Sequence, residues 1–175
     1  MAVADAPQSL TLAENRDATE VYELASRRIF FGLLTVVLLL GLANTFGQSP
    51  TGSRVDAAAA TLEVSAPVDV RGGIYFQGRL RVRAHEQIDK PTLVLASGWA
   101  DSMHINTIEP APVEEASRDG DIALEFAPVA PGDLLTVYLQ FQVNPNNLGV
   151  RSQDVRLYDD TELLATAERT VHIWP

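Results

Sequence analysis

The sequence predicts an all-β fold, an antiparallel two-sheet sandwich, preceded by one N-terminal transmembrane α-helix. Two observations carry this prediction. Residues 29–47 form one apolar run with no charged side chain, whereas the chain after residue 60 alternates apolar and polar side chains at the period of a β-strand. The parallel alternative fails because the sequence leaves no room for crossover helices.

The first 28 residues are expected to form a cytoplasmic N-terminal segment that is partly helical. Thr11 and Glu14 have the spacing of a capping box, so a helix can begin directly after Thr11. No Gly or Pro interrupts the chain between there and Arg28, so we expect the helix to continue into the apolar run.

Residues 29–47 are predicted to be a transmembrane signal-anchor helix. A helix of 19 residues is about 28 Å long, close to the ~30 Å thickness of the hydrocarbon core. Arg27 and Arg28 directly precede it, which places the N-terminus inside the cytoplasmic membrane and the C-terminal domain outside, in a single-pass topology. Cleavage as a signal peptide stays an alternative, because Gly41-Leu42-Ala43 offers a small-x-small site, although the preceding segment is long and acidic.

Residues 48–60 are expected to be a linker, since turn formers are followed by an alanine-rich stretch. Residues 61–175 are the predicted extracytoplasmic β-sandwich domain, with turn signals such as Pro131-Gly132 between its alternating segments. The expected strands are 61–64, 68–71, 79–84, 92–96, 104–108, 122–126, 135–143, 155–158 and 170–174.

The long strand 135–143, which follows Val129-Ala130-Pro131-Gly132, and a closing hairpin around Asp159-Asp160 together resemble bacterial immunoglobulin-like or fibronectin-type extracytoplasmic sandwiches. The resemblance is architectural and covers the external domain alone. It implies adhesion, spacing or partner recognition, while fold alone does not settle function. One Lys beside twelve Arg indicates a GC-rich coding bias and hence a bacterial source.

The composition limits the available chemistry. A net charge of −10 argues against nucleic acid as a partner, and the absence of cysteine excludes thiolate metal sites and disulfides. The three histidines, His85, His104 and His172, lack paired ligand spacing, so no metal or cofactor is expected. Ser102 and His104 share one strand face, but nothing supplies an acid or an oxyanion hole, and no catalytic residue is assigned.

We therefore expect a single-pass membrane protein that is not an enzyme and that displays an immunoglobulin-like domain as an accessory subunit or binding module. Its expected partners are the lipid bilayer and a membrane or envelope protein. The alternative is an anchored or secreted hydrolase-type enzyme with a site in the sandwich loops.

Arg79, Arg81 and Arg83 share one face of a predicted strand and form a cationic ridge of roughly 13 Å. The alternative for this ridge is a solvated face whose arginines pair with acids across the sheet. Aromatic residues and an asparagine-rich turn are further recognition candidates, although core packing remains the alternative for Phe76 and Trp99. The full set of partner-binding candidates is Tyr75, Phe76, Arg79, Arg81, Arg83, Trp99, Asn144, Asn146, Asn147 and Trp174.

Overall fold

The computed structural model describes residues 10–43, 48–101, 103–146 and 148–175, with side chains from residue 22 onward. The chain divides into two compact units, Met1–Gly47 and Gln48–Pro175. Each unit is described by itself.

The described residues of the first unit form a helix, α1 (Leu10–Leu42), of 33 residues. Its segment Tyr22–Leu42 is long and apolar enough to cross a membrane, and a signal sequence meets the same criteria. Large apolar side chains are exposed all around this segment, so no stripe marks a face that packs on protein. The hydroxyl of Thr35 donates to the carbonyl oxygen of Phe31 at 2.7 Å, which satisfies it within the helix.

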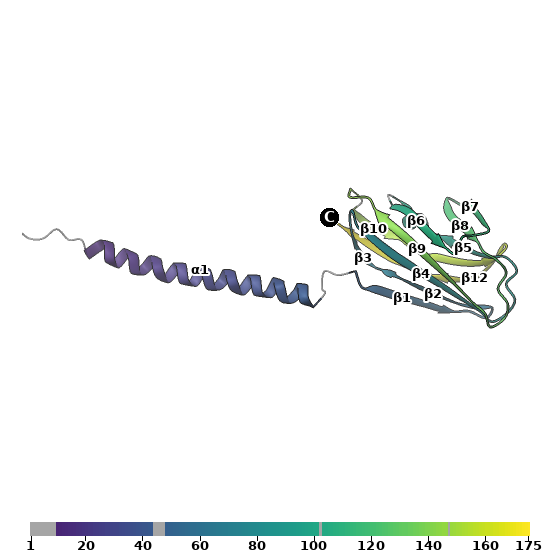
Figure 1. Ribbon diagram of the computed structural model, residues 1–175, viewed down its shortest axis with the longest axis horizontal. Helices are drawn as coiled ribbons and strands as arrows, with labels where there is room; N and C mark the ends of the chain where they lie inside the picture. Colours follow the sequence, from purple (N-terminus) through teal and green to yellow (C-terminus); the bar gives the residue numbers. More distant parts are fainter. Residues whose placement is uncertain (1–9, 44–47, 102, 147) are drawn as a thin grey trace, which may run out of the picture. The chain divides into compact units, whose positions relative to one another are not determined.

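The second unit is a β-sandwich of three sheets (Figure 1). Two sheets have five strands each, in the orders β1-β2-β4-β9-β6 and β12-β11-β5-β8-β7, and a third has the order β10-β13-β3. Neighbouring strands are antiparallel, apart from the parallel pair β13 and β3. The strands are β1 (Pro50–Asp56), β2 (Ala60–Pro67), β3 (Asp69–Arg71), β4 (Tyr75–Ala84), β5 (Pro91–Leu95), β6 (Met103–Glu109), β7 (Glu114–Arg118), β8 (Asp121–Glu125), β9 (Leu134–Val143), β10 (Gly149–Ser152), β11 (Val155–Asp159), β12 (Glu162–Ala167) and β13 (Thr170–Trp174).

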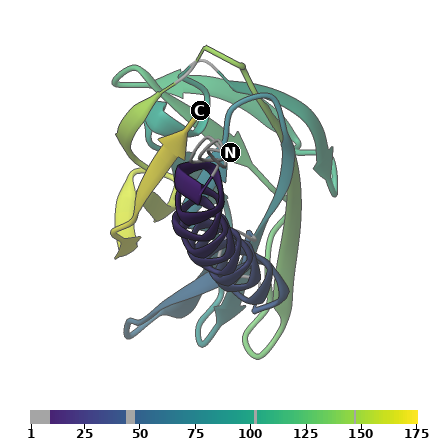
Figure 2. The ribbon, with the colours of Figure 1, turned by 90° about the vertical axis from the view of Figure 1, so that its left-hand side faces the viewer.

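The core lies between the sheets and is filled by the inward side of each alternating strand. Figure 2, which looks along the strands, shows them around a common interior. Phe141 lies at its centre, stacked on Phe76 at a centroid distance of 4.9 Å and contacting Trp99 at 5.2 Å. Trp99 belongs to a short 3-10 helix, Ser97–Trp99, and its indole N–H donates to the carbonyl oxygen of Gln153 at 3.0 Å. Aromatic packing of this kind stabilises a sandwich that has no disulfide.

The predicted fold class is confirmed, and every expected strand coincides with an observed one. The expectation that residues 48–60 form a linker is corrected, because they contain β1. This strand pairs with β2 from Pro50↔Pro67 to Asp56↔Thr61. Strand β7, which is not among the expected strands, pairs with β8 at a sheet edge. In both β1 and β7 the main-chain ladder supplies the pairing while most side chains stay exposed.

Candidate functional site

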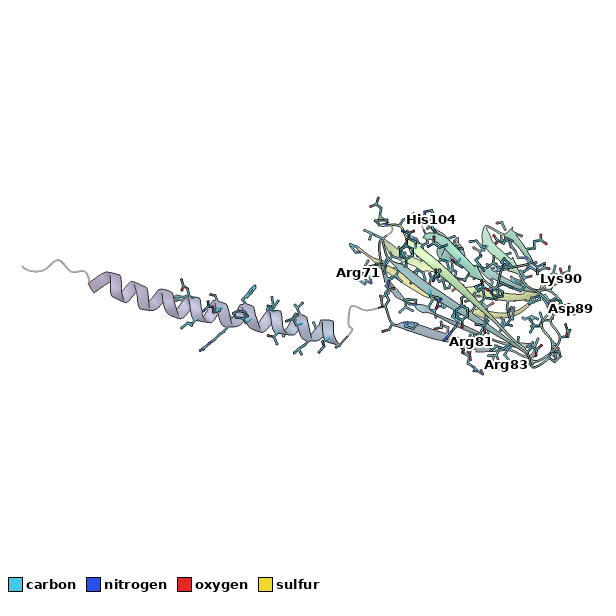
Figure 3. All side chains as sticks on the ribbon, viewed as in Figure 1. Arg71, Arg81, Arg83, Asp89, Lys90 and His104 are labelled. Carbon is cyan, nitrogen blue, oxygen red and sulfur yellow. The ribbon has the colours of Figure 1, made fainter. Side chains whose placement is uncertain are left out.

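The candidate site is the outer face of the sheet β1-β2-β4-β9, which we call the arginine face and define by Arg54, Arg79, Arg81 and Arg83. Strand β4 alternates strictly, so Leu80 and its inward neighbours are fully buried while the arginines point outward. In Figure 3, Arg81 and Arg83 project away from the sandwich on this side. The predicted orientation of the β4 ridge is therefore confirmed.

The strand register decides which side chains surround the ridge. Arg81 stands directly opposite Glu63 on β2, the arrangement expected for a cross-strand ion pair. The Glu63 carboxylate is instead held by Arg54 on β1, at 2.6 Å from the Arg54 Nη1 atom. Within the described part of the chain, Arg79, Arg81 and Arg83 have no carboxylate within ion-pair distance.

A shallow depression of about 180 Å³ lies at the centre of the arginine face. The Arg81 Nε atom is buried and has no hydrogen-bond partner among the described residues. A buried donor without an acceptor costs about 1–3 kcal/mol. The depression is lined by Arg54, Thr61, Glu63, Arg81, Arg83 and Leu134, which gives three guanidinium groups against one carboxylate.

The edge of the arginine face holds a local electrostatic network. The hydrogen bond from Arg54 lowers the pKa of the Asp56 carboxyl below its ordinary value, and a hydrogen bond from the Thr61 hydroxyl lowers it further. The same pairing raises the pKa of Arg54. Thr61 also lies 3.1 Å from the His85 Nε2 atom.

The contacts of Thr61 do not have the order of a catalytic triad. In a triad the acid orients the imidazole, whereas here the Asp56 carboxylate binds the hydroxyl and the other imidazole nitrogen of His85 faces the Ala58 carbonyl oxygen at 3.2 Å. Thr61 is also largely buried, at 4% exposed. Among the described residues, no group of three His, Asp or Glu side chains is placed to hold a metal ion.

The remaining predicted residues fall into separate places. Phe76 and Trp99 lie in the core and are outside the arginine face, as the alternative of core packing expected. Tyr75 begins β4 and is exposed, and Trp174 on β13 is exposed with its indole N–H donating to the Asp69 carboxylate at 3.2 Å.

The asparagine-rich turn lies in the connection from β9 to β10. Asn146 is exposed and Asn144 is half-buried, whereas Asn147 lies outside the described residues. Of the Ser102 and His104 pair, Ser102 also lies outside the described residues, and His104 is exposed on β6 opposite Gln142.

Sequence reasoning missed Arg54 and Tyr138 as members of this face. Arg54 was assigned to a linker, and only the pairing of β1 with β2 brings it beside Glu63. Tyr138 lies opposite Arg79 across β4 and β9 and is partly exposed. The alternation of β9 predicts that the Tyr138 side chain points outward. The register that places it opposite Arg79 could not be predicted from either strand alone.

Comparisons with known proteins find similar structures but no matching protein family. No protein-family model matches the chain, and no curated protein matches it. A non-cellulosomal cohesin from the archaeon Archaeoglobus fulgidus is similar at 13% identity and a TM-score of 0.43, over 73% of this chain and 92% of that one.

Two further solved structures are similar. The chitin-binding domain of a chitinase from Pyrococcus furiosus matches at 13% identity and a TM-score of 0.39, over 66% of this chain and 99% of that one. A β-glucosidase from Listeria innocua matches at 10% identity and a TM-score of 0.31, over 72% of this chain and 16% of that one. These similarities assign the chain to no family.

Proposed function

We propose that this is a single-pass membrane protein whose sandwich lies outside the cytoplasmic membrane as a non-catalytic binding module. We further propose that its arginine face binds an acidic segment of a membrane or envelope protein, with the whole acting as an accessory subunit. The carrying observation is the row Arg79, Arg81 and Arg83, which points outward without ion-pair partners among the described residues.

The charge balance of the domain supports an acidic ligand. From Arg54 onward the sequence has 18 acids and 10 bases, so a cluster of unpaired arginines stands against the overall sign. Guanidinium groups bind carboxylates through paired N–H donors, and such charge-assisted bonds are stronger than neutral ones. Tyr138, which lies opposite Arg79 on the same face, adds amphipathic contact area of the kind enriched in protein interfaces.

The binding proposal is tested with fluorescent poly-L-glutamate as the acidic probe and the full chain in detergent micelles. The double variant Arg81→Gln with Arg83→Gln is expected to weaken binding about tenfold, which corresponds to ~1.4 kcal/mol. Lys90→Gln with Arg118→Gln is the matched control, because it removes the same charge away from the arginine face and should leave binding unchanged. Equal losses in both variants would show a net-charge effect and refute the proposed site.

The topology is tested separately, and the chain is suited to it because it has no native cysteine. A membrane-impermeant maleimide added to intact cells should label Leu163→Cys in the sandwich and spare Glu23→Cys at the start of the apolar segment. The reverse labelling pattern overturns the orientation. A mature mass that lacks the residues before Asn44 would instead identify a cleaved signal peptide.

A further inference from the structure

One end of the sandwich gathers exposed apolar side chains, and we call it the tether end because β1 begins there. It carries Tyr75, Leu148, Val150 and Trp174, which are 64%, 49%, 58% and 55% exposed. In Figure 1 the C terminus, β3 and β10 lie together at this end. Four large exposed apolar side chains at one end of the domain are more than scattered exposure explains.

Main-chain contacts hold these residues together although they come from three parts of the sequence. The Gly72 N–H donates to the Trp174 carbonyl oxygen at 2.8 Å, and Gly73 donates to Val143 at 2.9 Å. Val150 pairs with His172 across β10 and β13. A Cβ atom at Gly72 would lie 2.8 Å from the Pro145 carbonyl oxygen, so the two loops approach at backbone distance. The tether end is therefore a fixed platform.

The charge of the tether end differs from that of the domain. The stretches 70–85, 134–153 and 169–175, which supply it, contain no Asp or Glu. The nearby acid Asp69 accepts the Trp174 indole N–H, and Asp101 is paired with Arg151 at 3.0 Å. Arg71 is exposed at this end, opposite the end that carries Asp89 and Lys90 (Figure 3). The platform thus combines apolar and aromatic side chains with an exposed cation.

The chain segment between the apolar helix and the second unit is short. Six residue steps separate Leu42, where α1 ends, from Gln48, where the second unit begins. A fully extended chain advances at most ~3.6 Å per residue, so these steps reach about 20 Å. If α1 spans a bilayer, the lipid headgroup region is the apolar–polar boundary nearest to the tether end.

We propose that the tether end docks on the lipid headgroup region, with Trp174, Tyr75, Leu148 and Val150 entering the interface and Arg71 facing lipid phosphates. This inference rests on the membrane anchoring proposed above. Trp and Tyr favour the headgroup level because one part of the ring is apolar and another is polar. Burial of apolar area and electrostatic attraction to anionic lipids both strengthen binding at a membrane surface, and Arg71 supplies the positive charge here.

The test uses single-cysteine variants of the full chain, spin-labelled and reconstituted into phosphatidylcholine vesicles with and without phosphatidylglycerol. Collision rates with oxygen, which concentrates in lipid, and with a water-soluble nickel chelate report the depth of each label. Leu148→Cys is expected to favour oxygen, more so with phosphatidylglycerol. Leu163→Cys is the matched control, because it is similarly exposed on β12 near the Lys90–Asp160 ion pair and should favour nickel.

A label at Leu38→Cys within α1 separates the two proposals. If it lies in lipid while Leu148→Cys favours nickel, the docking inference is wrong and the anchoring stands. If Leu38→Cys itself favours nickel, the anchoring fails and the docking fails with it. A Leu148→Cys label shielded from both reagents would show a protein contact, such as a second copy, and would also overturn lipid docking.

A second variant checks that the contact is apolar in origin. Val150→Glu places a carboxylate on the platform at an exposed site that leaves the core intact. With the label at Leu148→Cys, it should lower the ratio of oxygen to nickel collisions to that of the control site. Leu163→Glu should leave the ratio at Leu148→Cys unchanged, and an equal fall in both variants would refute the inference.

Discussion

Replacing Arg169 by methionine should weaken the attachment of β1 to the sandwich. Arg169 is 6% exposed, and its guanidinium group donates to acceptors on two strands. On β1 it binds the Thr51 carbonyl oxygen at 2.9 Å and the Ser53 hydroxyl at 2.9 Å. On β2 it binds the carbonyl oxygens of Val64 at 3.3 Å and Ala66 at 2.7 Å. Burial lowers the pKa of Arg169, yet an arginine stays charged at neutral pH.

The magnitude follows from which acceptors lose their partner. Val64 and Ala66 are fully buried, so water cannot replace the guanidinium there, whereas Thr51 is exposed. The loss of two buried hydrogen bonds to a charged group costs about 3–6 kcal/mol in all. Removing a buried charge recovers part of this cost, because the Arg169 Nε atom has no partner among the described residues. We expect Arg169→Met to lower the free energy of unfolding by about 3 kcal/mol.

The assay is urea unfolding of the full chain in detergent micelles, followed by tryptophan fluorescence. Trp99 and Trp174 are the two tryptophans of the chain, so the signal reports the sandwich and not the helix. Arg83→Met is the control, because Arg83 is exposed and its hydrogen bond to the Gly132 carbonyl oxygen is 3.4 Å long.

Hydrogen exchange should show the loss first in the amides of β1, with β4 and β9 still protected. Free energies of unfolding for Arg169→Met and Arg83→Met that agree within ~0.5 kcal/mol would refute the reasoning.

Two further predictions concern close packing and pH. Gly98→Ala should destabilise the sandwich by at least about 2 kcal/mol, because its Cβ atom would overlap the Ser152 carbonyl oxygen. Gly52→Ala is the control, because its Cβ atom would meet nothing within 4 Å, and urea unfolding should show it to be nearly neutral. Arg54→Ala should raise the pKa of Asp56 toward its ordinary value, as followed by carboxylate carbon chemical shifts across a pH titration. Because the folded-state pKa is lowered, the Asp56 contribution to stability is present above the unfolded pKa and is lost as pH falls through the folded one. An Asp56 pKa that does not move in Arg54→Ala would contradict this account.

Strands β4 and β9 were predictable because one side of each is buried and the other faces water. Burial on one side imposes a period of two on the sequence, and that period is local information. Strands β1 and β7 lack it, since most of their side chains are exposed and their pairing depends on main-chain bonds. The sequence of such a strand consists mainly of polar and small residues, so it cannot be distinguished from the sequence of a linker.

The candidate site was predictable only where it depends on the alternation of buried and exposed side chains along one strand. The outward row of Arg79, Arg81 and Arg83 follows from alternation alone. The absence of an acidic partner for Arg81 among the described residues does not follow from it, because Arg54 binds the Glu63 carboxylate once β1 has paired with β2. Arg169 lies more than a hundred residues from its β1 and β2 acceptors, so no local sequence pattern predicts that it binds these strands.

The position of β1 bears on how the protein would carry a mechanical load. If α1 is held in a bilayer and a partner is held on the arginine face, a pull directed along β1 enters the sandwich at Pro50. That strand is joined to β2 by seven consecutive residue pairs in antiparallel register, so the force acts in shear and loads the ladder as a whole. Peeling one bond at a time would need a pull across the strands. The edge strand β1, whose sequence resembles a flexible linker, would then be the element that resists extension.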